Sequence, residues 1–325
     1  MRRREVIGGL SAGLTAWPLR AQQRRPVIGF LSSESPALFA SRLMSFREGL
    51  RETGFVEGEN VEIEFRWAEG QNDRLPELAA DLVRHQVNVI AVPGTTPGAL
   101  AAKRATSTIP IVINTAGDPV ALGLVASLSR PGGNVTGRTS IGGELGPKRL
   151  ELLREAMPTA TVMALLVNPS NPALMETTAQ AVRAAAVTLG LELHVINVGT
   201  AAELDAVFPA LVQLRASGLV IAIDSFFTAR REKLASLAIR HGIAAIYQYR
   251  DFAAAGGLMS YGDSLADGYR LVGVYTGRIL KDGNPADLPI HRPSNTELVV
   301  SIKNATTLSL TIPRNLLARA DEVIE

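Results

Sequence analysis

Short apolar runs alternate with longer amphipathic stretches along the chain from residue 26 onward. The runs have the length of strands and are mostly continuous; they occur at residues 27–31, 61–65, 87–92, 109–113, 162–167, 191–198, 219–223 and 244–247. Between them, apolar residues recur at helical spacing, as Leu43, Phe46 and Leu50 do before Gly54 provides a typical helix end. The pattern predicts strands in alternation with helices.

The predicted helices complete an α/β arrangement. They cover residues 38–50, 75–83, 99–102, 145–157, 175–189, 203–215, 230–240 and 265–280, with Asp73 as the cap of the second and a last apolar segment at 297–302. Continuous apolar strands are typical of parallel sheets covered on both faces. With 325 residues, the chain is expected to form two doubly wound parallel-sheet lobes that divide near residue 138. Ligands bind outside the carboxyl ends of such strands.

The first 21 residues have the order of an export signal. Three arginines at positions 2–4 precede a mild apolar run from 6 to 19, and Ala21 offers a cleavage point. The run is too short for a membrane anchor, and residues 3–7 resemble the twin-arginine motif. Because the chain has no cysteine for a lipid tether, we expect export to a periplasm. The alternative is an amphipathic N-terminal helix that stays attached.

Charge and composition argue against several function classes. Four of the 33 basic and one of the 31 acidic residues lie in the expected signal, so the remainder carries a net charge of −1. This balance gives no electrostatic basis for binding nucleic acid. A sequence without cysteine forms no disulfide and no thiolate centre, and the four histidines are not paired at metal-ligand spacing. No dinucleotide glycine fingerprint follows the first strand, so neither a cofactor nor a metal is expected.

Polar residues follow the predicted strands of the first lobe. Ser32 and Ser33 follow the first strand, Gly94, Thr95 and Thr96 follow the third, and Asn114 follows the fourth. Backbone N–H groups and hydroxyls at 94–96, ahead of a helix, suit a carboxylate, although the same residues also make an ordinary helix cap. Asp118 precedes a predicted apolar helix and fits two roles equally, a partner for a solute amine or hydroxyl and a simple cap.

The second lobe offers a similar set. Asp224 ends a strand beside Phe226, and a carboxylate next to aromatic faces suits an amine with an apolar side chain. The alternative places the neighbouring aromatic rings in the core. Asn168 is either a turn residue or a polar contact to the solute. Tyr247 and Tyr261 also end strands, where each offers a flat face and a hydroxyl, and Tyr261 alternatively belongs to the hinge.

Six segments distributed over almost the whole chain carry a family resemblance. They are Phe-Arg-Glu-Gly-Leu at 46–50, Trp-Ala-Glu-Gly at 67–70, Gly-Asp-Pro-Val at 117–120, Ser-Arg-Pro-Gly-Gly-Asn-Val-Thr-Gly at 129–137, Ala-Ala-Ala-Gly-Gly-Leu-Met-Ser-Tyr-Gly at 253–262 and Leu-Ala-Arg-Ala-Asp-Glu-Val-Ile-Glu at 317–325. The chain resembles the substrate-binding proteins of ABC transporters, in the tryptophan-binding-like branch of the type I periplasmic binding fold. It departs from that family at 94–98, with Gly-Thr-Thr-Pro-Gly in place of Gly-Thr-Pro-Ala-Thr.

The resemblance implies two similar lobes, one of residues 26–137 and 262–288 and the other of 138–261 and 289–325. Crossings near 136–140, 260–262 and 287–291 would join them. It also implies capture of a small solute in the cleft, without catalysis, and delivery to the membrane subunits of an ABC permease. An amino acid is the favoured solute, and a monomer is expected. The alternatives are an exported ligand-sensing module and a doubly wound α/β enzyme.

Overall fold

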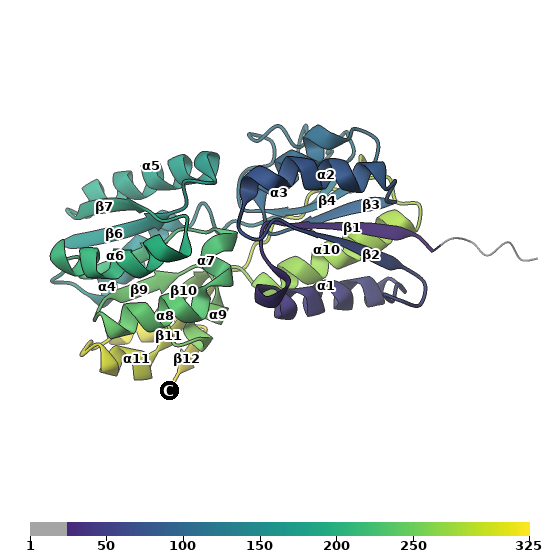
Figure 1. Cartoon of the computed structure of the whole chain (residues 1–325). Helices are drawn as coiled ribbons and strands as arrows, with labels where there is room; N and C mark the ends of the chain where they lie inside the picture. Colours follow the sequence, from purple (N-terminus) through teal and green to yellow (C-terminus); the bar gives the residue numbers. More distant parts are fainter. Residues whose placement is uncertain (1–24) are drawn as a thin grey trace, which may run out of the picture.

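The computed structural model describes residues 25–325, so the expected export signal lies outside the described part of the chain. Two α/β lobes lie next to each other along the long axis of the molecule (Figure 1). Each lobe has its own sheet, as the alternation of strands and helices predicted. Within residues 25–325, no helix combines the length and the apolar character that a bilayer-spanning segment requires.

The first lobe is built on a parallel sheet in the order β2-β1-β3-β4-β5. Its strands are β2 (Glu62–Trp67), β1 (Val27–Ser32), β3 (Val89–Pro93), β4 (Ile111–Thr115) and β5 (Val135–Thr139). Helices α2 (Leu75–Arg84) and α3 (Thr96–Ala105) cover one face, and α1 (Ala40–Glu52) and α10 (Leu265–Leu280) cover the other (Figure 1). Strands β3, β4 and β5 are buried along their whole length. Burial on both faces explains the mainly apolar sequences of β3 and β4, whereas β5 carries the polar side chains of the crossing, among them Arg138.

The second lobe has a seven-stranded sheet in the order β12-β11-β10-β9-β8-β6-β7, with one antiparallel pair, β10–β11. Its strands are β6 (Val162–Val167), β7 (Glu192–Asn197), β8 (Gly218–Ile221), β9 (Ala244–Tyr247), β10 (Met259–Gly262), β11 (Glu297–Ser301) and β12 (Glu322–Ile324). Its helices are α4 (Gly146–Ala156), α5 (Pro172–Thr188), α6 (Ala201–Gln213), α7 (Ser225–Ala229), α8 (Arg231–Arg240), α9 (Arg250–Ala254), α11 (Ile302–Thr307) and α12 (Arg314–Leu317). Apolar residues of α4 and α5 form the core on one face, and those of α6, α8 and α9 form it on the other.

Helices α1 and α10 pack at unusually short range. A Cβ atom added at Gly49 would lie 1.8 Å from the carbonyl oxygen of Arg270, and one added at Gly273 would lie 2.1 Å from that of Phe46. Only glycine therefore allows this approach at either position. The packing brings the N-terminal parts of both helices, with Arg42 and Tyr269, to the end of the first lobe that faces the second lobe.

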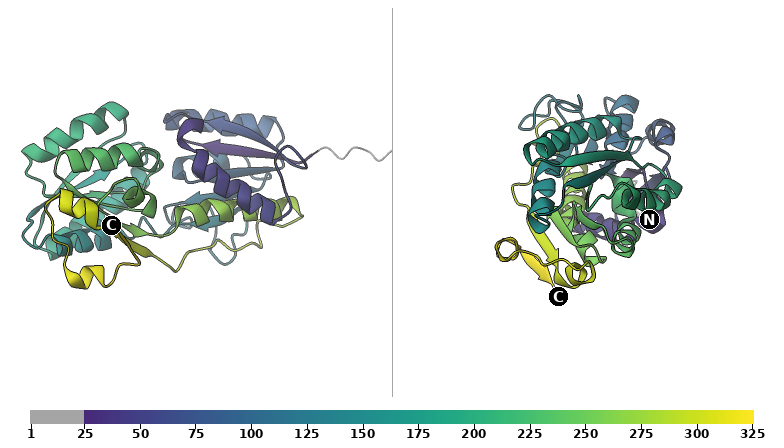
Figure 2. Two further views of the ribbon diagram at one scale, coloured as in Figure 1. Left: turned by 90° about the horizontal axis from the view of Figure 1, so that it is seen from below. Right: turned by 90° about the vertical axis from the view of Figure 1, so that its left-hand side faces the viewer.

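Three segments connect the lobes, at the end of β5, after β10, and between α10 and β11 (Figure 2). Arg138 of the first crossing and Asp263 of the second form a buried ion pair. The Ser140 hydroxyl also donates to Asp263 Oδ1, at 2.8 Å. The His291 N–H donates to the Gly137 carbonyl at 2.8 Å, and the His291 carbonyl accepts from the backbone of residue 139 at 2.9 Å. Hydrogen bonds and the ion pair thus join all three crossings. Strand β5 extends to residue 139, two residues past the expected division at 137.

Some local predictions are wrong. The helix expected after Asp118 is absent, because a turn ends at Gly123, which has the left-handed φ of +68°. Asp73 lies within a short 3₁₀ turn, Asn72–Arg74, and gives no side-chain cap to α2. The helix expected at 230–240 begins one residue later, after the separate helix α7. Strand β12 and helices α11 and α12 were not predicted from the pattern.

Candidate ligand-binding site

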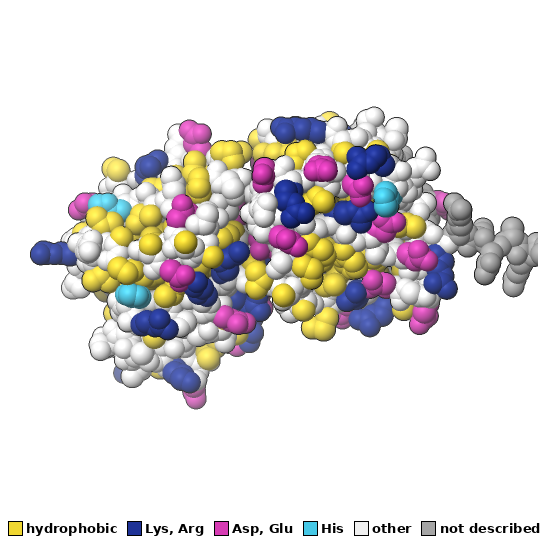
Figure 3. Space-filling view, viewed as in Figure 1, with side chains coloured by type: hydrophobic (Ala, Val, Ile, Leu, Met, Phe, Trp, Pro, Cys, Tyr) yellow, Lys and Arg dark blue, Asp and Glu magenta, His cyan; other side chains and the backbone are white. Residues whose placement is uncertain are grey.

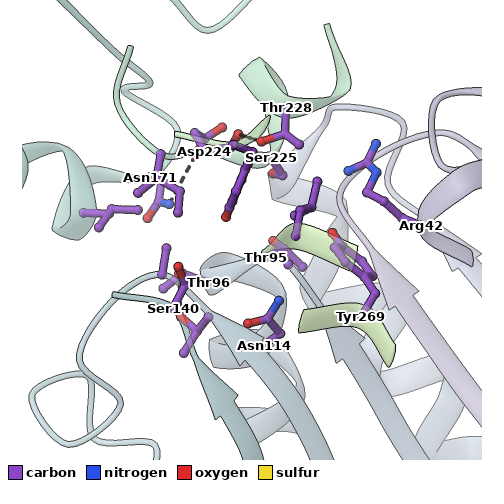
Figure 4. Close-up of a pocket in the computed structure, with 17 residues that line it drawn as sticks. Arg42, Thr95, Thr96, Asn114, Ser140, Asn171, Asp224, Ser225, Thr228 and Tyr269 are labelled. Carbon is purple, nitrogen blue, oxygen red and sulfur yellow. Dashed lines mark hydrogen bonds between the residues drawn. The ribbon is translucent and has the colours of Figure 1, made fainter. Parts of the chain in front are cut away.

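A cavity opens between the lobes, where strands of both sheets end. It holds about 450 Å³ of empty space, its mouth included. Figure 4 shows side chains of the first lobe along one wall and those of the second lobe along the other. The lining residues are Arg42, Gly94, Thr95, Thr96, Asn114, Thr115, Ala116, Ser140, Asn171, Leu174, Ile223, Asp224, Ser225, Thr228, Tyr249, Leu265 and Tyr269. Because both lobes contribute, the site is complete only when they approach each other.

The turn between β3 and α3 forms part of the first-lobe wall. Gly94 has φ of +84°, and a Cβ there would lie 2.1 Å from the Tyr269 hydroxyl, so glycine is required on both counts. Thr95 is the N-cap of α3, and its hydroxyl accepts from the Gly98 N–H at 3.3 Å. The Thr96 hydroxyl is 2.8 Å from that of Thr115. Both threonine hydroxyls therefore already have partners within the protein.

Asp224 provides the carboxylate of the second-lobe wall. It caps α7, and its Oδ1 accepts from the Phe226 N–H at 2.9 Å and from Asn168 Nδ2 at 2.8 Å. Its Oδ2 accepts from Asn171 Nδ2 at 3.3 Å. Burial raises the pKa of this carboxyl above its ordinary value, against the opposing effect of these hydrogen bonds. Oδ2 accepts only this one bond and has capacity for another, and Asp224 lines the cavity.

Arg42 lies at one end of the cavity. Its side chain is buried, and its Nη2 donates to the Leu38 carbonyl. Its guanidinium carbon is 4.3 Å from the centre of the Phe39 ring and 6.0 Å from that of Tyr269. Its Nε and Nη1 have no hydrogen-bond partner within residues 25–325. The cavity therefore has a positive group at its α1 end and a negative group on the opposite wall (Figure 4).

Three polar contacts link the lobes beside the cavity. The hydroxyls of Ser33 and Ser225 are 3.0 Å apart, and Asn72 Nδ2 donates to the Ser170 hydroxyl at 3.0 Å. The third is an ion pair between Glu34 and Arg230, with 3.6 Å between Oε2 and Nη1.

Glu34 lies almost completely buried where these contacts meet. Burial raises its pKa to about 7, although the positive charges of Arg230 and Arg42 lower it. The carboxyl of Glu34 is thus a buried acid close to the cavity wall.

Five of the predicted site residues line the cavity: Gly94, Thr95, Thr96, Asn114 and Asp224. Two more lie directly behind the wall, Ser33 through its contact with Ser225 and Asn168 through its bond to Asp224. These seven residues lie at or just after the ends of five different strands, and the two sheets bring them together because the carboxyl ends of the strands face the cleft.

The remaining predicted residues lie outside the lining. Asp118 is exposed, and its Oδ1 accepts from the Val120 N–H at 2.9 Å, so it caps a turn. Ser32 bonds to the N–H of residue 34. Phe226 packs under Arg230, whose guanidinium carbon is 3.9 Å from the ring centre. Tyr247 stacks on a neighbouring ring in the core at 4.7 Å, and Tyr261 bonds to Thr296 in the hinge.

Sequence reasoning missed most of the other lining residues. Asn171 and Ser225 lie within three residues of predicted ones, so a wider window around each strand end would include them. Arg42 and Tyr269 lie near the N-terminal ends of helices, and no local signal in the sequence indicates that these ends reach the cleft. No group of three or more His, Cys, Asp or Glu side chains suited to a metal occurs within residues 25–325.

Two α/β lobes joined by three crossings around a polar cavity define a two-lobed solute-binding fold. A model of the ABC transporter substrate-binding protein family matches residues 27–324, and the chain belongs to this family. Membership assigns the chain a solute-binding role rather than a catalytic one.

Individual relatives agree with this assignment. The tyrosine-binding protein of Clostridioides difficile (strain R20291) is 26% identical over 272 residues, which is 82% of this chain and 76% of that protein. Two solved structures share the type I periplasmic binding fold: a conserved domain protein from Vibrio cholerae (TM-score 0.82) and the ABC domain from Streptococcus pneumoniae in complex with L-Trp (TM-score 0.81). Each is 24% identical to this chain and matches 92% of it over 100% of its own length.

Proposed function

We propose that this protein is the exported solute-binding component of an ABC importer and that its solute is an amino acid with a sizeable apolar side chain. The observation that carries the proposal is Asp224, a buried carboxylate on the wall of a cavity whose other lining residues, apart from Arg42 at its α1 end, are neutral polar and apolar. A buried carboxylate with a free acceptor position suits an ammonium group, because a charge in such a place needs a partner.

The rest of the lining suits the other parts of an amino acid. Leu174, Ile223 and Leu265 supply apolar surface from both lobes, and Tyr249 and Tyr269 add aromatic rings. Small-molecule sites bind their ligands through apolar contacts and a few polar groups that fix orientation, and this lining has the same mixture. The named ligands of the two relatives above, tyrosine and L-Trp, support an aromatic side chain.

Export and partners belong to the same proposal. The basic, apolar and small-residue order of the first 21 residues supports delivery to the periplasm, and the family supports the membrane subunits of an ABC permease as partners. On the face shown in Figure 3, basic and acidic side chains are interspersed over both lobes, which fits a small-molecule ligand better than a polyanion. We infer a monomer that acts alone until it meets the permease.

Binding measurements test the proposal. Purified protein is melted with each of the common L-amino acids and, as controls, with pentoses, hexoses and dicarboxylates. Because a ligand that binds the folded state alone raises its stability, an aromatic amino acid is expected to raise Tm, and calorimetry then gives its affinity. Stabilisation by sugars or dicarboxylates and by no amino acid would contradict the proposed solute class.

A further inference from the structure

Arg42 has hydrogen-bonding capacity that the protein does not use. A guanidinium carries five N–H groups, one on Nε and two on each terminal nitrogen. Only Nη2 of Arg42 has a partner, the Leu38 carbonyl, so three N–H groups on Nε and Nη1 are buried without an acceptor in the described part of the chain. Buried donors are normally satisfied, and a charged group left unsatisfied is especially unfavourable.

The other buried arginines are better satisfied. Arg138 pairs with Asp263, and Arg149 donates from Nε and Nη1 to the carbonyls of Tyr261 and Gly142, which leaves its Nη2 alone without a partner within residues 25–325. Arg42 has no carboxylate within ion-pair distance among residues 25–325. It is also the one arginine among the residues that line the cavity.

The acids near Arg42 are already engaged. Glu34 faces Arg230 from a distance of 3.6 Å, and Asp224 accepts three hydrogen bonds on the opposite wall. Thr95 and Thr96, where the sequence suggested a carboxylate site, are neutral: the Thr95 hydroxyl accepts from the Gly98 N–H, and the Thr96 hydroxyl shares a hydrogen bond with that of Thr115. Arg42 adds the positive charge that a buried anion needs, and it is therefore the better-placed group for an anion in the cavity.

The position of Arg42 is fixed on two sides. Helix α1 holds its backbone against α10, and the rings of Phe39 and Tyr269 lie beside its guanidinium. A guanidinium held by aromatic faces loses little freedom when it binds an anion. Figure 4 shows Arg42 beside Tyr269 at one end of the cavity, and Asp224 on the opposite wall nearer its middle.

We propose that Arg42 binds the carboxylate of the solute, so that the cavity selects molecules with a carboxylate at the α1–α10 end and a cationic group toward Asp224. The inference deepens the proposed function and rests on it for the identity of the cationic group. On this proposal the solutes are free zwitterionic amino acids. Amines and esters with the same side chain lack the carboxylate and should bind more weakly.

The test combines variants of the protein with variants of the ligand. Affinities of L-tryptophan and L-tyrosine are measured by calorimetry beside tryptamine and tyramine, which lack the carboxylate, and indole-3-propionate, which lacks the amine. The proteins are wild type, Arg42→Met and Arg42→Lys. Arg47→Met is the matched control, because Arg47 lies on the same helix but pairs with Glu57 away from the cavity.

Wild type is expected to prefer the amino acid over its amine. Arg42→Met should weaken amino-acid binding by about 30-fold or more and leave amine binding nearly unchanged, since loss of a buried charge pair costs at least a factor of this size. Arg42→Lys should recover part of the preference, and Arg47→Met should bind as wild type does. Melting curves establish that each variant is folded.

Three results would separate the possible failures. If Arg42→Met weakened amino acid and amine equally, Arg42 would have a structural role only, and the proposed function would stand. Binding of amines as tight as that of amino acids in the wild type would also overturn the Arg42 assignment. If indole-3-propionate bound and no amino acid did, with loss of binding in Arg42→Met, the assignment of Arg42 would hold and the amino-acid proposal would fail.

Discussion

Asp224 has two roles in one carboxyl group, as the cap of α7 and as the acid of the cavity wall. Replacing it with Asn keeps an oxygen for the cap and removes the charge. We expect Asp224→Asn to weaken amino-acid binding by roughly 2–5 kcal/mol and to change the free energy of unfolding by less than about 1 kcal/mol. Calorimetry and melting measure the two effects separately.

Asp118→Asn is the matched control for this variant. Asp118 is exposed and caps a turn through the Val120 N–H, an interaction that Asn also makes. Binding and stability should both stay within about 0.5 kcal/mol of wild type. Equal loss of affinity in the two variants would show that neither acid contacts the solute specifically.

Glu34 links stability to pH. Burial raises its pKa from 4.5 to about 7, so the folded protein holds a proton that the unfolded chain releases between these values. The unfolded state then binds fewer protons, and the free energy of unfolding falls as the pH rises from about 4.5 to 7. The effect is on the order of 3 kcal/mol across this window, and the raised pKa of Asp224 acts in the same direction.

Glu34→Gln tests this linkage, because glutamine does not titrate. Urea unfolding at pH 5 and pH 7.5 should show a smaller difference in the variant than in wild type. A difference of the same size in both proteins would mean that Glu34 titrates near its ordinary pKa in the folded state.

At the scale of elements, the contact between α1 and α10 determines part of the site. Gly273→Ala adds a methyl group 2.1 Å from the Phe46 carbonyl oxygen, so the helices have to separate. Over-packing of this kind costs roughly 1–3 kcal/mol or more, and we expect a lower Tm. Because α1 carries Arg42 and α10 carries Tyr269, amino-acid affinity should fall as well.

Gly133→Ala is a suitable comparison for this change. A Cβ at Gly133 meets only the Lys103 Nζ, at 3.6 Å, which is ordinary contact distance. Its Tm and its affinity should match those of wild type. If Gly273→Ala behaved like Gly133→Ala, the close approach of α1 and α10 would not be required for stability or binding.

The elements differ in how far the sequence determines them. Buried strands such as β3, β4 and β8 are largely apolar runs that can be recognised in the sequence. Because parallel strands share one carboxyl edge, the ends of these three strands predicted that Gly94, Asn114 and Asp224 lie at the cleft. Arg42 and Tyr269 could not be found in this way. They line the cavity because two helices far apart in the sequence pack through glycines, and this tertiary contact leaves no local pattern.

Short polar turns were the other source of error. The segment after Asp118 has apolar residues at helical positions, but Gly123 follows after only four residues and ends the turn. Helix nucleation is unfavourable over so short a stretch. The site hypothesis for Asp118 rested on its place just after the fourth strand, but the residue lies in an exposed turn and is not part of the cavity lining.

At the scale of the whole molecule, the contacts across the cavity belong to a closed arrangement of the lobes. The Ser33–Ser225 and Asn72–Ser170 hydrogen bonds and the Glu34–Arg230 ion pair exist only when the lobes meet. A solute that touches both walls favours this state, since it gains contacts that an open state lacks. Small-angle scattering should therefore show a smaller radius of gyration when a bound amino acid is added.

Arg230→Met should reduce this compaction at a given amino-acid concentration, because it removes the ion pair and keeps an apolar chain over Phe226. The control is Arg250→Met, whose pair with Glu322 lies within the second lobe. A radius that saturating ligand leaves unchanged in wild type would indicate a rigid site instead.

Strand β1 points toward the cleft, where Ser33 meets the second lobe, so its first residue lies about 20 Å away at the outer end of the first lobe. The chain ends at Glu325, one residue past β12 at the edge of the second lobe (Figure 2). A pair of fluorophores attached near residue 25 and residue 325 would thus report on different lobes, and neither would block the cavity. Energy transfer between them would turn the protein into a direct optical sensor for its solute.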